Sequence, residues 1–224
     1  MNGRTKKLLT ILAVMLAIAI TGVGAFFMQQ QTNSRHALAK PIKVACVGDS
    51  ITQGFGYPQT LQRLLGNDFN VSNFGLGGTT VTLESPTPYM YEPVFDAAIA
   101  KQPDIVIIML GTNDAHPGLQ IYNGTFVNDY IALVNQFQNL TSKPEIWLVK
   151  PPPVFNDGTG LSTQYFREKI ISGIEETAMQ CDLPIIDVYS ALLNHPEYFA
   201  YDGVHPDPRA ANVIANEVYK AISR

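Results

Sequence analysis

The chain has 224 residues, a formal net charge of −4 and 46% hydrophobic residues, a composition typical of a globular protein. All 19 acidic residues and all but four of the 15 basic ones follow residue 39, so the part that can form a domain is acidic. An acidic domain with scattered lysines excludes nucleic acid as the expected partner.

The first 39 residues have the features of an export signal. A basic start precedes an uncharged stretch, residues 8–28, which is long enough to cross a bilayer core at about 1.5 Å per residue. The small-residue sequence Ala37–Ala39 resembles a cleavage site. We therefore predict that residues 1–39 are either a cleaved signal peptide or an uncleaved membrane anchor with a short linker. The positive N-terminus predicts that residues 40–224, one domain, are secreted or at the cell surface, with membrane contact only through the first segment.

After residue 40, short apolar runs alternate with longer segments of helical periodicity. The runs are rich in β-branched residues and too short for helices, so they predict strands, at Ile42–Val47, Phe69–Asn73, Ile105–Leu110, Ile146–Val149 and Pro184–Val188. The predicted helices cover Tyr57–Leu65, Val94–Lys101, Phe126–Asn139, Thr163–Gln180 and Pro208–Ser223. Near-continuous apolar strands are typical of a parallel sheet buried on both faces. The alternation predicts a doubly wound α/β sandwich, with a five-stranded parallel sheet flanked by helices.

Polar residues that could carry chemistry follow four of the predicted strands. They are Gly48-Asp49-Ser50 after the first, Gly75 to Thr79 after the second, Gly111 to Asp114 after the third, and Asp202 and His205 beyond the fifth. In an open parallel sheet the carboxyl ends of the strands form the ligand-binding edge. A hydroxyl, glycine amides, a carboxamide, a carboxylate and an imidazole at one edge are the groups that acyl transfer requires.

The order of these residues resembles the SGNH/GDSL hydrolases. The matching blocks are Gly48-Asp49-Ser50, Asn73-x-Gly75-x-x-Gly78, Gly111-x-Asn113-Asp114 and Asp202-x-x-His205. One block would be weak support, whereas four in order across residues 42–210 are specific. The chain departs from the family pattern at Ile51, where the GDSL signature has leucine, and at Gly77, where many members have serine.

The resemblance implies an SGNH-type, flavodoxin-like three-layer sandwich and a serine esterase. Ser50 would be the nucleophile, His205 its base, and Asp202 the carboxylate that orients the imidazole. The oxyanion hole would consist of the amides of Ser50 and Gly78 and the side chain of Asn113. No cofactor is implied, and no residue cluster has the spacing of a zinc site.

Several neighbouring residues have alternative interpretations. Asp49 either supports the turn before Ser50 or contacts substrate, and Asp114 is expected to be structural. His116, in a polar loop, is a candidate substrate contact and a rival base, whereas His195 is expected at the surface. Asp187, at the end of the fifth predicted strand, is the rival to Asp202.

Two tyrosines and two cysteines complete the candidates. Tyr89 and Tyr91 either stack on sugar rings or pack their loop against the domain. Cys46 falls within the first predicted strand, so free buried thiols are favoured over a disulfide between Cys46 and Cys181, which an exported chain could also form.

The segment Lys43–Gly66 resembles bacterial carbohydrate O-acetylesterases of the same family. The resemblance implies a small ester or an acetylated glycan as substrate. A lysophospholipase or thioesterase of this family is the alternative enzyme, and a non-catalytic glycan-binding module is the alternative from another class.

Overall fold

The computed structural model describes residues 22–24, 40–156 and 160–223. The predicted leader, residues 1–39, lies outside this description apart from residues 22–24, and it stays a prediction. Within the described ranges, no helix has both the length and the apolar character that a membrane span needs. The folded unit comprises Pro41–Arg224.

Five parallel strands form one sheet in the order β2-β1-β3-β4-β5. They are β1 (Ile42–Gly48), β2 (Phe69–Gly75), β3 (Ile105–Met109), β4 (Glu145–Lys150) and β5 (Ile185–Asp187). This is the flavodoxin-like order, in which the ligand crevice lies where the strand sequence reverses, between β1 and β3. The predicted fold class and all five predicted strands are confirmed.

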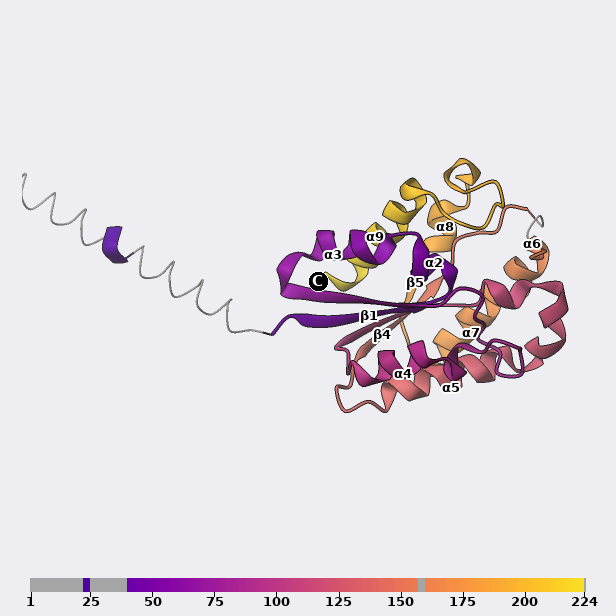
Figure 1. Cartoon of the computed structure of the whole chain (residues 1–224), viewed down its shortest axis with the longest axis horizontal. Helices are drawn as coiled ribbons and strands as arrows, with labels where there is room; N and C mark the ends of the chain where they lie inside the picture. Colours follow the sequence, from indigo (N-terminus) through magenta and orange to yellow (C-terminus); the bar gives the residue numbers. More distant parts are fainter. Residues whose placement is uncertain (1–21, 25–39, 157–159, 224) are drawn as a thin grey trace, which may run out of the picture. The chain divides into compact units, whose positions relative to one another are not determined.

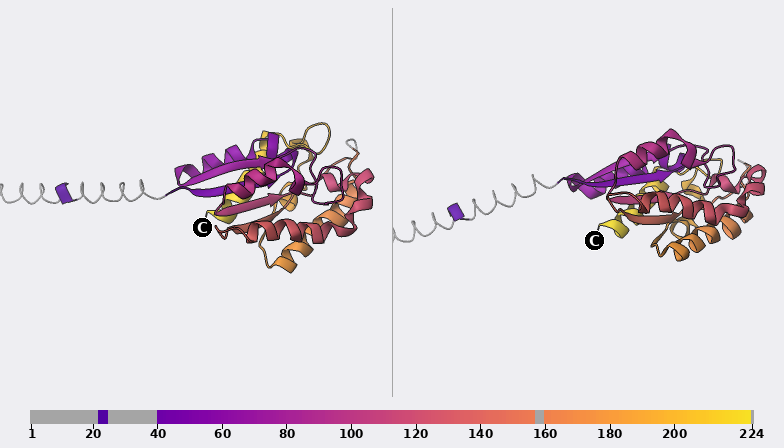
Figure 2. Two further views of the ribbon diagram at one scale, coloured as in Figure 1. Left: turned by 60° about the horizontal axis from the view of Figure 1, so that its bottom comes forward. Right: turned by 90° about the horizontal axis from the view of Figure 1, so that it is seen from below.

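Helices cover both faces of the sheet, as Figure 1 and the turned views in Figure 2 show. One face carries α3 (Tyr57–Leu65), α8 (Val188–Leu192) and α9 (Pro208–Ile222), and the other carries α4 (Pro93–Ala100), α5 (Phe126–Gln138) and α7 (Ser172–Cys181). In β1, Val44 and Cys46 pack into the first layer, while Ala45 and Val47 pack into the second. Successive side chains of a strand point to opposite faces, so a strand covered on both sides must be apolar throughout.

Two helical features differ from the prediction. The predicted helix Thr163–Gln180 is divided into α6 (Thr163–Tyr165), a π-helical segment η6 (Phe166–Ile171) and α7. A π-helical turn adds a residue without breaking the apolar pattern, so the sequence did not reveal it. The five-residue helices α2 (Ser50–Gly54) and α8 were not predicted, because five residues are too few to show a helical period.

Segments of 3₁₀ helix, of three residues except for the nine-residue η4, join the larger elements. They lie at η1 (Gly66–Asp68), η2 (Tyr89–Tyr91), η3 (Asn113–Ala115), η4 (Pro117–Thr125) and η7 (Pro196–Tyr198).

Both cysteines are free, as predicted, but Cys181 is only partly buried, whereas two buried thiols were expected. Cys46 is fully buried inside the sheet, and burial raises the pKa of its thiol to about 12. A thiol held in its protonated form is a poor nucleophile, so Cys46 serves as a small core side chain.

Candidate active site

The helix α2 places Ser50 at the carboxyl edge of the sheet. Ser50 is its first residue, and the buried side chain of Asp49 caps it by accepting a 3.0 Å hydrogen bond from the Ile51 N–H. The helix lies directly on the end of β2, where a Cβ atom at Gly75 would stand only 2.3 Å from the backbone nitrogen of Gln53. Only glycine permits this approach, which explains its place in the second block.

Asn73 fastens α2 from the same strand. Its Nδ2 donates to the carbonyl of Thr52 at 2.8 Å, and its Oδ1 accepts from the Gly75 N–H at 2.9 Å. The first two sequence blocks are therefore one structural unit that fixes the position of the serine.

Ser50, His205 and Asp202 form a continuous hydrogen-bonded array. The Oγ of Ser50 lies 3.0 Å from Nε2 of His205, and Nδ1 of His205 lies 2.7 Å from Oδ2 of Asp202. The other carboxylate oxygen, Oδ1, accepts from the backbone N–H groups of Val204 at 2.9 Å and His205 at 3.0 Å. The three side chains thus have the contacts that the roles implied by the resemblance require.

The same hydrogen bonds keep Asp202 ionised. Partial burial alone would raise the pKa of this carboxyl, but the bonds from the His205 backbone, the His205 ring and the Val204 backbone outweigh it and lower the pKa below its usual value. A carboxylate that stays negative beside Nδ1 holds the proton on that nitrogen and leaves Nε2 to accept one from Ser50.

The loop after β2 brings amide donors to the array. Gly78 has φ of +80°, in the left-handed region, and a Cβ there would meet nothing within 4 Å. Glycine suits this position because its backbone conformation is one that other residues rarely adopt.

Of the two neighbouring glycines, Gly78 has the unused amide. The N–H of Gly77 donates to Oε1 of Gln53 at 2.9 Å, whereas the Gly78 N–H has no hydrogen-bond acceptor among the described residues. Asn113 uses one Nδ2 proton on the Thr79 carbonyl at 2.8 Å, which leaves the second available.

These groups share one cavity of about 240 Å³. Its polar lining consists of Ser50, Gly78, Asn113, His116 and His205. Its apolar lining consists of Leu119, Leu161 and Val204, three isolated apolar residues that belong to no periodic pattern in the sequence.

The structure corrects two of the substrate-contact predictions, those for Asp49 and Tyr89, because both side chains are buried. Asp49 is buried as a helix cap, and Tyr89 is fully buried, with its hydroxyl donating to the Phe74 carbonyl. Tyr89 therefore packs its loop against the domain, the other interpretation considered for it, while Tyr91 is 69% exposed.

Asp187 and His195 lie in other interactions. Asp187 pairs with Lys150 and accepts hydrogen bonds from Ser190; partial burial raises its pKa, but these partners outweigh that effect and lower it. His195 pairs with Glu197 at the surface.

The buried Asp114 holds the loop that follows Gly78. It accepts bonds from the backbone of Val81 and from the backbone and hydroxyl of Thr82, as its structural interpretation predicted. Burial nevertheless raises the pKa of this carboxyl to about 6.

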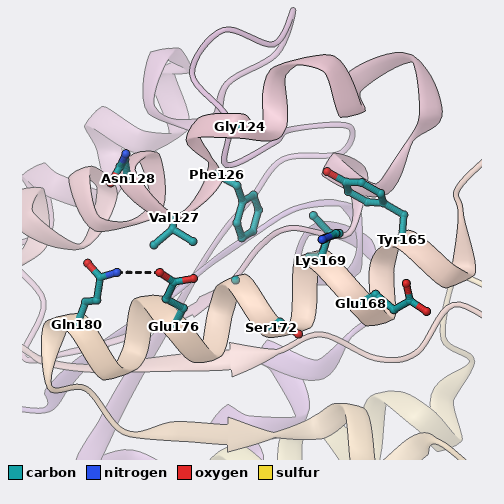
Figure 3. Close-up of a pocket in the computed structure, with 12 residues that line it drawn as sticks. Gly124, Phe126, Val127, Asn128, Tyr165, Glu168, Lys169, Ser172, Glu176 and Gln180 are labelled. Carbon is teal, nitrogen blue, oxygen red and sulfur yellow. Dashed lines mark hydrogen bonds between the residues drawn. The ribbon is translucent and has the colours of Figure 1, made fainter.

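A larger groove, of about 470 Å³, lies between α5 and the η6–α7 segment (Figure 3). Its lining includes Tyr165, Lys169 and Ser172 but no histidine. It therefore has no serine–imidazole pair. Among the described residues, no group of three or more His, Cys, Asp or Glu could hold a metal ion.

A parallel α/β sandwich with a Ser–His–Asp array at its carboxyl edge has the layout of a serine hydrolase. Comparison with known proteins agrees, because residues 46–212 match the GDSL-like Lipase/Acylhydrolase family. The chain belongs to this family.

Individual relatives are consistent with that assignment. An acetylxylan esterase from Xylanibacter ruminicola is 32% identical over 206 residues, covering 81% of this chain and 43% of the relative, so the chain spans less than half of that protein's length. The lipase/acylhydrolase from Enterococcus faecalis superposes with a TM-score of 0.67 at 21% identity, over 81% of this chain and 95% of that one. The acetyl xylan esterase AlAXEase superposes with a TM-score of 0.67 at 22% identity, over 81% of this chain and 100% of that one. The two structural likenesses concern the fold.

Proposed function

We propose that this protein is a serine esterase that hydrolyses small O-acyl esters, in particular O-acetyl groups on carbohydrate. The observation that carries the proposal is the contact of 3.0 Å between Ser50 Oγ and His205 Nε2, with Asp202 2.7 Å from the opposite ring nitrogen. Serine needs such a base, because its hydroxyl is a weak nucleophile until its proton is removed.

In the proposed reaction, Oγ of Ser50 attacks the ester carbonyl carbon while its proton passes to Nε2 of His205. The carbonyl oxygen becomes an oxyanion, which the N–H groups of Ser50 and Gly78 and the free Nδ2 proton of Asn113 stabilise. The C–O bond to the alcohol then breaks, and the alcohol leaves with the proton from His205. Water then gives a proton to Nε2 of His205 and attacks the carbonyl carbon of the acyl-serine. The bond from that carbon to Oγ breaks, Oγ takes the proton back from His205, and the carboxylic acid leaves.

The dimensions of the cavity support a short acyl group. At about 240 Å³ it lies below the range of roughly 300–1,000 Å³ typical of pockets for drug-sized ligands. The apolar side chains of Leu119, Leu161 and Val204 suit the methyl group of an acetyl ester better than a charged acyl group. The 32% identity to an acetylxylan esterase favours an acetylated glycan over a lipid or a thioester.

The test uses the purified full-length chain and p-nitrophenyl esters from acetate to palmitate, beside acetylated xylan. We expect turnover that is greatest for acetate and falls steeply with acyl length, together with acetate release from the xylan. Ser50→Ala should abolish both, while Ser223→Ala, at the exposed end of α9, should abolish neither. Hydrolysis that survives Ser50→Ala would overturn the proposal.

Chain-length preference separates the alternatives. Preference for long acyl chains would favour a lysophospholipase or thioesterase. Xylan binding without any hydrolysis would favour a non-catalytic glycan-binding module. Either result would contradict the substrate class proposed here.

A further inference from the structure

The ring of Phe55 stacks on the imidazole of His205. The ring centroids are 4.7 Å apart and the planes are inclined by 21°. Phe55 is the C-cap residue of α2, the helix whose first residue is Ser50. The two ends of this helix therefore touch the same imidazole, Ser50 at its edge and Phe55 at its face.

The hydrogen bonds of His205 do not by themselves fix the plane of the ring. They are made at Nδ1 and Nε2, within the plane of the imidazole, and neither is made to a face of the ring. The ring is attached through Cβ, and small changes in the side-chain torsions of His205 turn its plane and tilt the Nε2 lone pair away from Ser50. A hydrogen bond weakens as its angle departs from linear, so the tilt matters for proton transfer.

The backbone that carries His205 does not fix the ring by itself. His205 lies in an irregular loop rather than in a helix or strand, and its side chain is 30% exposed. The loop is closed by main-chain bonds, from Ala200 N–H to the His205 carbonyl at 2.8 Å and from Phe155 N–H to the Gly203 carbonyl at 2.9 Å. These bonds hold the loop backbone and make no contact with the imidazole.

We propose that Phe55 is a positioning residue: its ring fixes the plane of the His205 imidazole relative to Ser50. The inference rests on the proposed esterase function. A site on a loop gains precision when a side chain from a rigid element packs against it, and α2 is anchored to β2 through Asn73 and Gly75. The stack also shields one face of the imidazole from water.

The expected kinetic signature is a loss in kcat with little change in KM. The interaction free energy of an aromatic pair corresponds to about a 2- to 13-fold change in a rate constant. We expect Phe55→Leu to lower kcat by a factor within that range. Phe55→Tyr keeps the stacked ring and should have the kcat of the wild type. The matched control is Phe69→Leu, at a half-buried phenylalanine at the amino end of β2, on the opposite edge of the sheet from the site.

A second measurement does not depend on turnover. The chain has four histidines, so the His205 ring protons can be assigned in the NMR spectrum by comparison with His205→Gln. A stacked phenyl ring shifts these protons upfield. The shift should vanish in Phe55→Leu, persist in Phe55→Tyr and be unchanged in Phe69→Leu.

The two measurements distinguish the failure of each proposal. If the wild type hydrolyses no ester although the upfield shift is present, the proposed function fails while the stack stands. If the wild type is active but Phe55→Leu has wild-type kcat, or if it raises KM with kcat unchanged, Phe55 is not a positioning residue. An equal loss of kcat in Phe55→Leu and Phe55→Tyr would likewise overturn the inference.

Discussion

The backbone N–H of Gly77 donates a hydrogen bond of 2.9 Å to Oε1 of Gln53. Gln53 stands three residues after Ser50 on α2, so the helix that carries the proposed nucleophile also holds the loop that carries Gly78. The bond uses the Gly77 amide and directs the next one, that of Gly78, to the cavity. Gln53 was not singled out in the sequence because it belongs to no family block.

Gln53→Leu should therefore lower kcat on p-nitrophenyl acetate by about 10-fold, less than the roughly 10²–10³-fold loss expected when an oxyanion donor is removed outright. Gln53→Glu retains an acceptor oxygen and should keep most of the activity. The control is Gln59→Leu, at an exposed position on α3. Equal kcat for Gln53→Leu and the wild type would show that the loop holds its position without this bond.

Asn113→Ala should lower kcat by roughly 10²–10³-fold with a small change in KM. The amide donates one proton to the Thr79 carbonyl and has a second for the oxyanion, which develops fully only in the transition state. Steady-state kinetics and a circular-dichroism melt of the same sample separate this effect from misfolding. An increase in KM at constant kcat would instead identify Asn113 as a ground-state substrate contact.

Asp202→Asn should lose up to about 10⁴-fold in kcat while the chain stays folded, because an amide beside Nδ1 favours the wrong tautomer of His205. Asp187→Asn is the matched control, since its carboxylate pairs with Lys150 and Ser190 rather than with a histidine. The two variants are compared by kcat on p-nitrophenyl acetate. An inactive, folded Asp187→Asn beside an active Asp202→Asn would reverse the assignment.

His116→Ala should separate two kinds of substrate. Nδ1 of His116 accepts a 3.1 Å hydrogen bond from the Gly118 N–H, so the neutral ring carries its proton on Nε2 and can donate it to a substrate hydroxyl. We expect kcat/KM on acetylated xylan to fall about 3- to 10-fold, the effect of one lost hydrogen bond, with no fall on p-nitrophenyl acetate, which has no hydroxyl there. A loss on both esters would mean that His116 acts on the reaction itself.

The sequence predicted the parts of this protein that repeat a simple physical pattern. Five apolar runs predicted five strands, and because parallel strands end at one edge, residues as distant as Ser50 and His205 could be placed together. The family resemblance implied that Asp202 orients His205, and the structure has the two side chains 2.7 Å apart.

What the sequence did not predict depends on contacts between segments without periodicity. The stack of Phe55 on His205 joins a helix cap to a distant loop. The cavity wall formed by Leu119 and Leu161 comes from η4 and from the segment before α6. The burial of Tyr89 also depends on contacts that the sequence does not show. Its position in a polar loop did not indicate that Tyr89 is fully buried. The buried hydroxyl is satisfied because it donates a hydrogen bond to the Phe74 carbonyl.

The free energy of unfolding of Asp49→Asn should increase relative to that of the wild type as the pH rises. Burial raises the pKa of Asp49 from its ordinary 3.8 to about 6, against the lowering effect of the Ile51 N–H. Between these two values the folded state binds more protons than the unfolded state, so the free energy of unfolding of the wild type falls as the pH rises from 4 to about 7. The accumulated loss is about 3 kcal/mol for this one group.

The asparagine removes this dependence and keeps the cap. Its Oδ1 can still accept from the Ile51 N–H, and its Nδ2 replaces Oδ2, which has no hydrogen-bond partner among the described residues. The hydroxyl of Thr112, also unpartnered there and near enough to lower the Asp49 pKa, can accept from that nitrogen. Urea unfolding at pH 4, 5.5 and 7 measures the difference between Asp49→Asn and the wild type, and it should grow in favour of the variant by up to about 3 kcal/mol. Asp68→Asn, at an exposed carboxylate on η1, is the control for the loss of one negative charge. A difference that stays constant or shrinks with rising pH would mean that Asp49 is ionised in the folded protein at no cost.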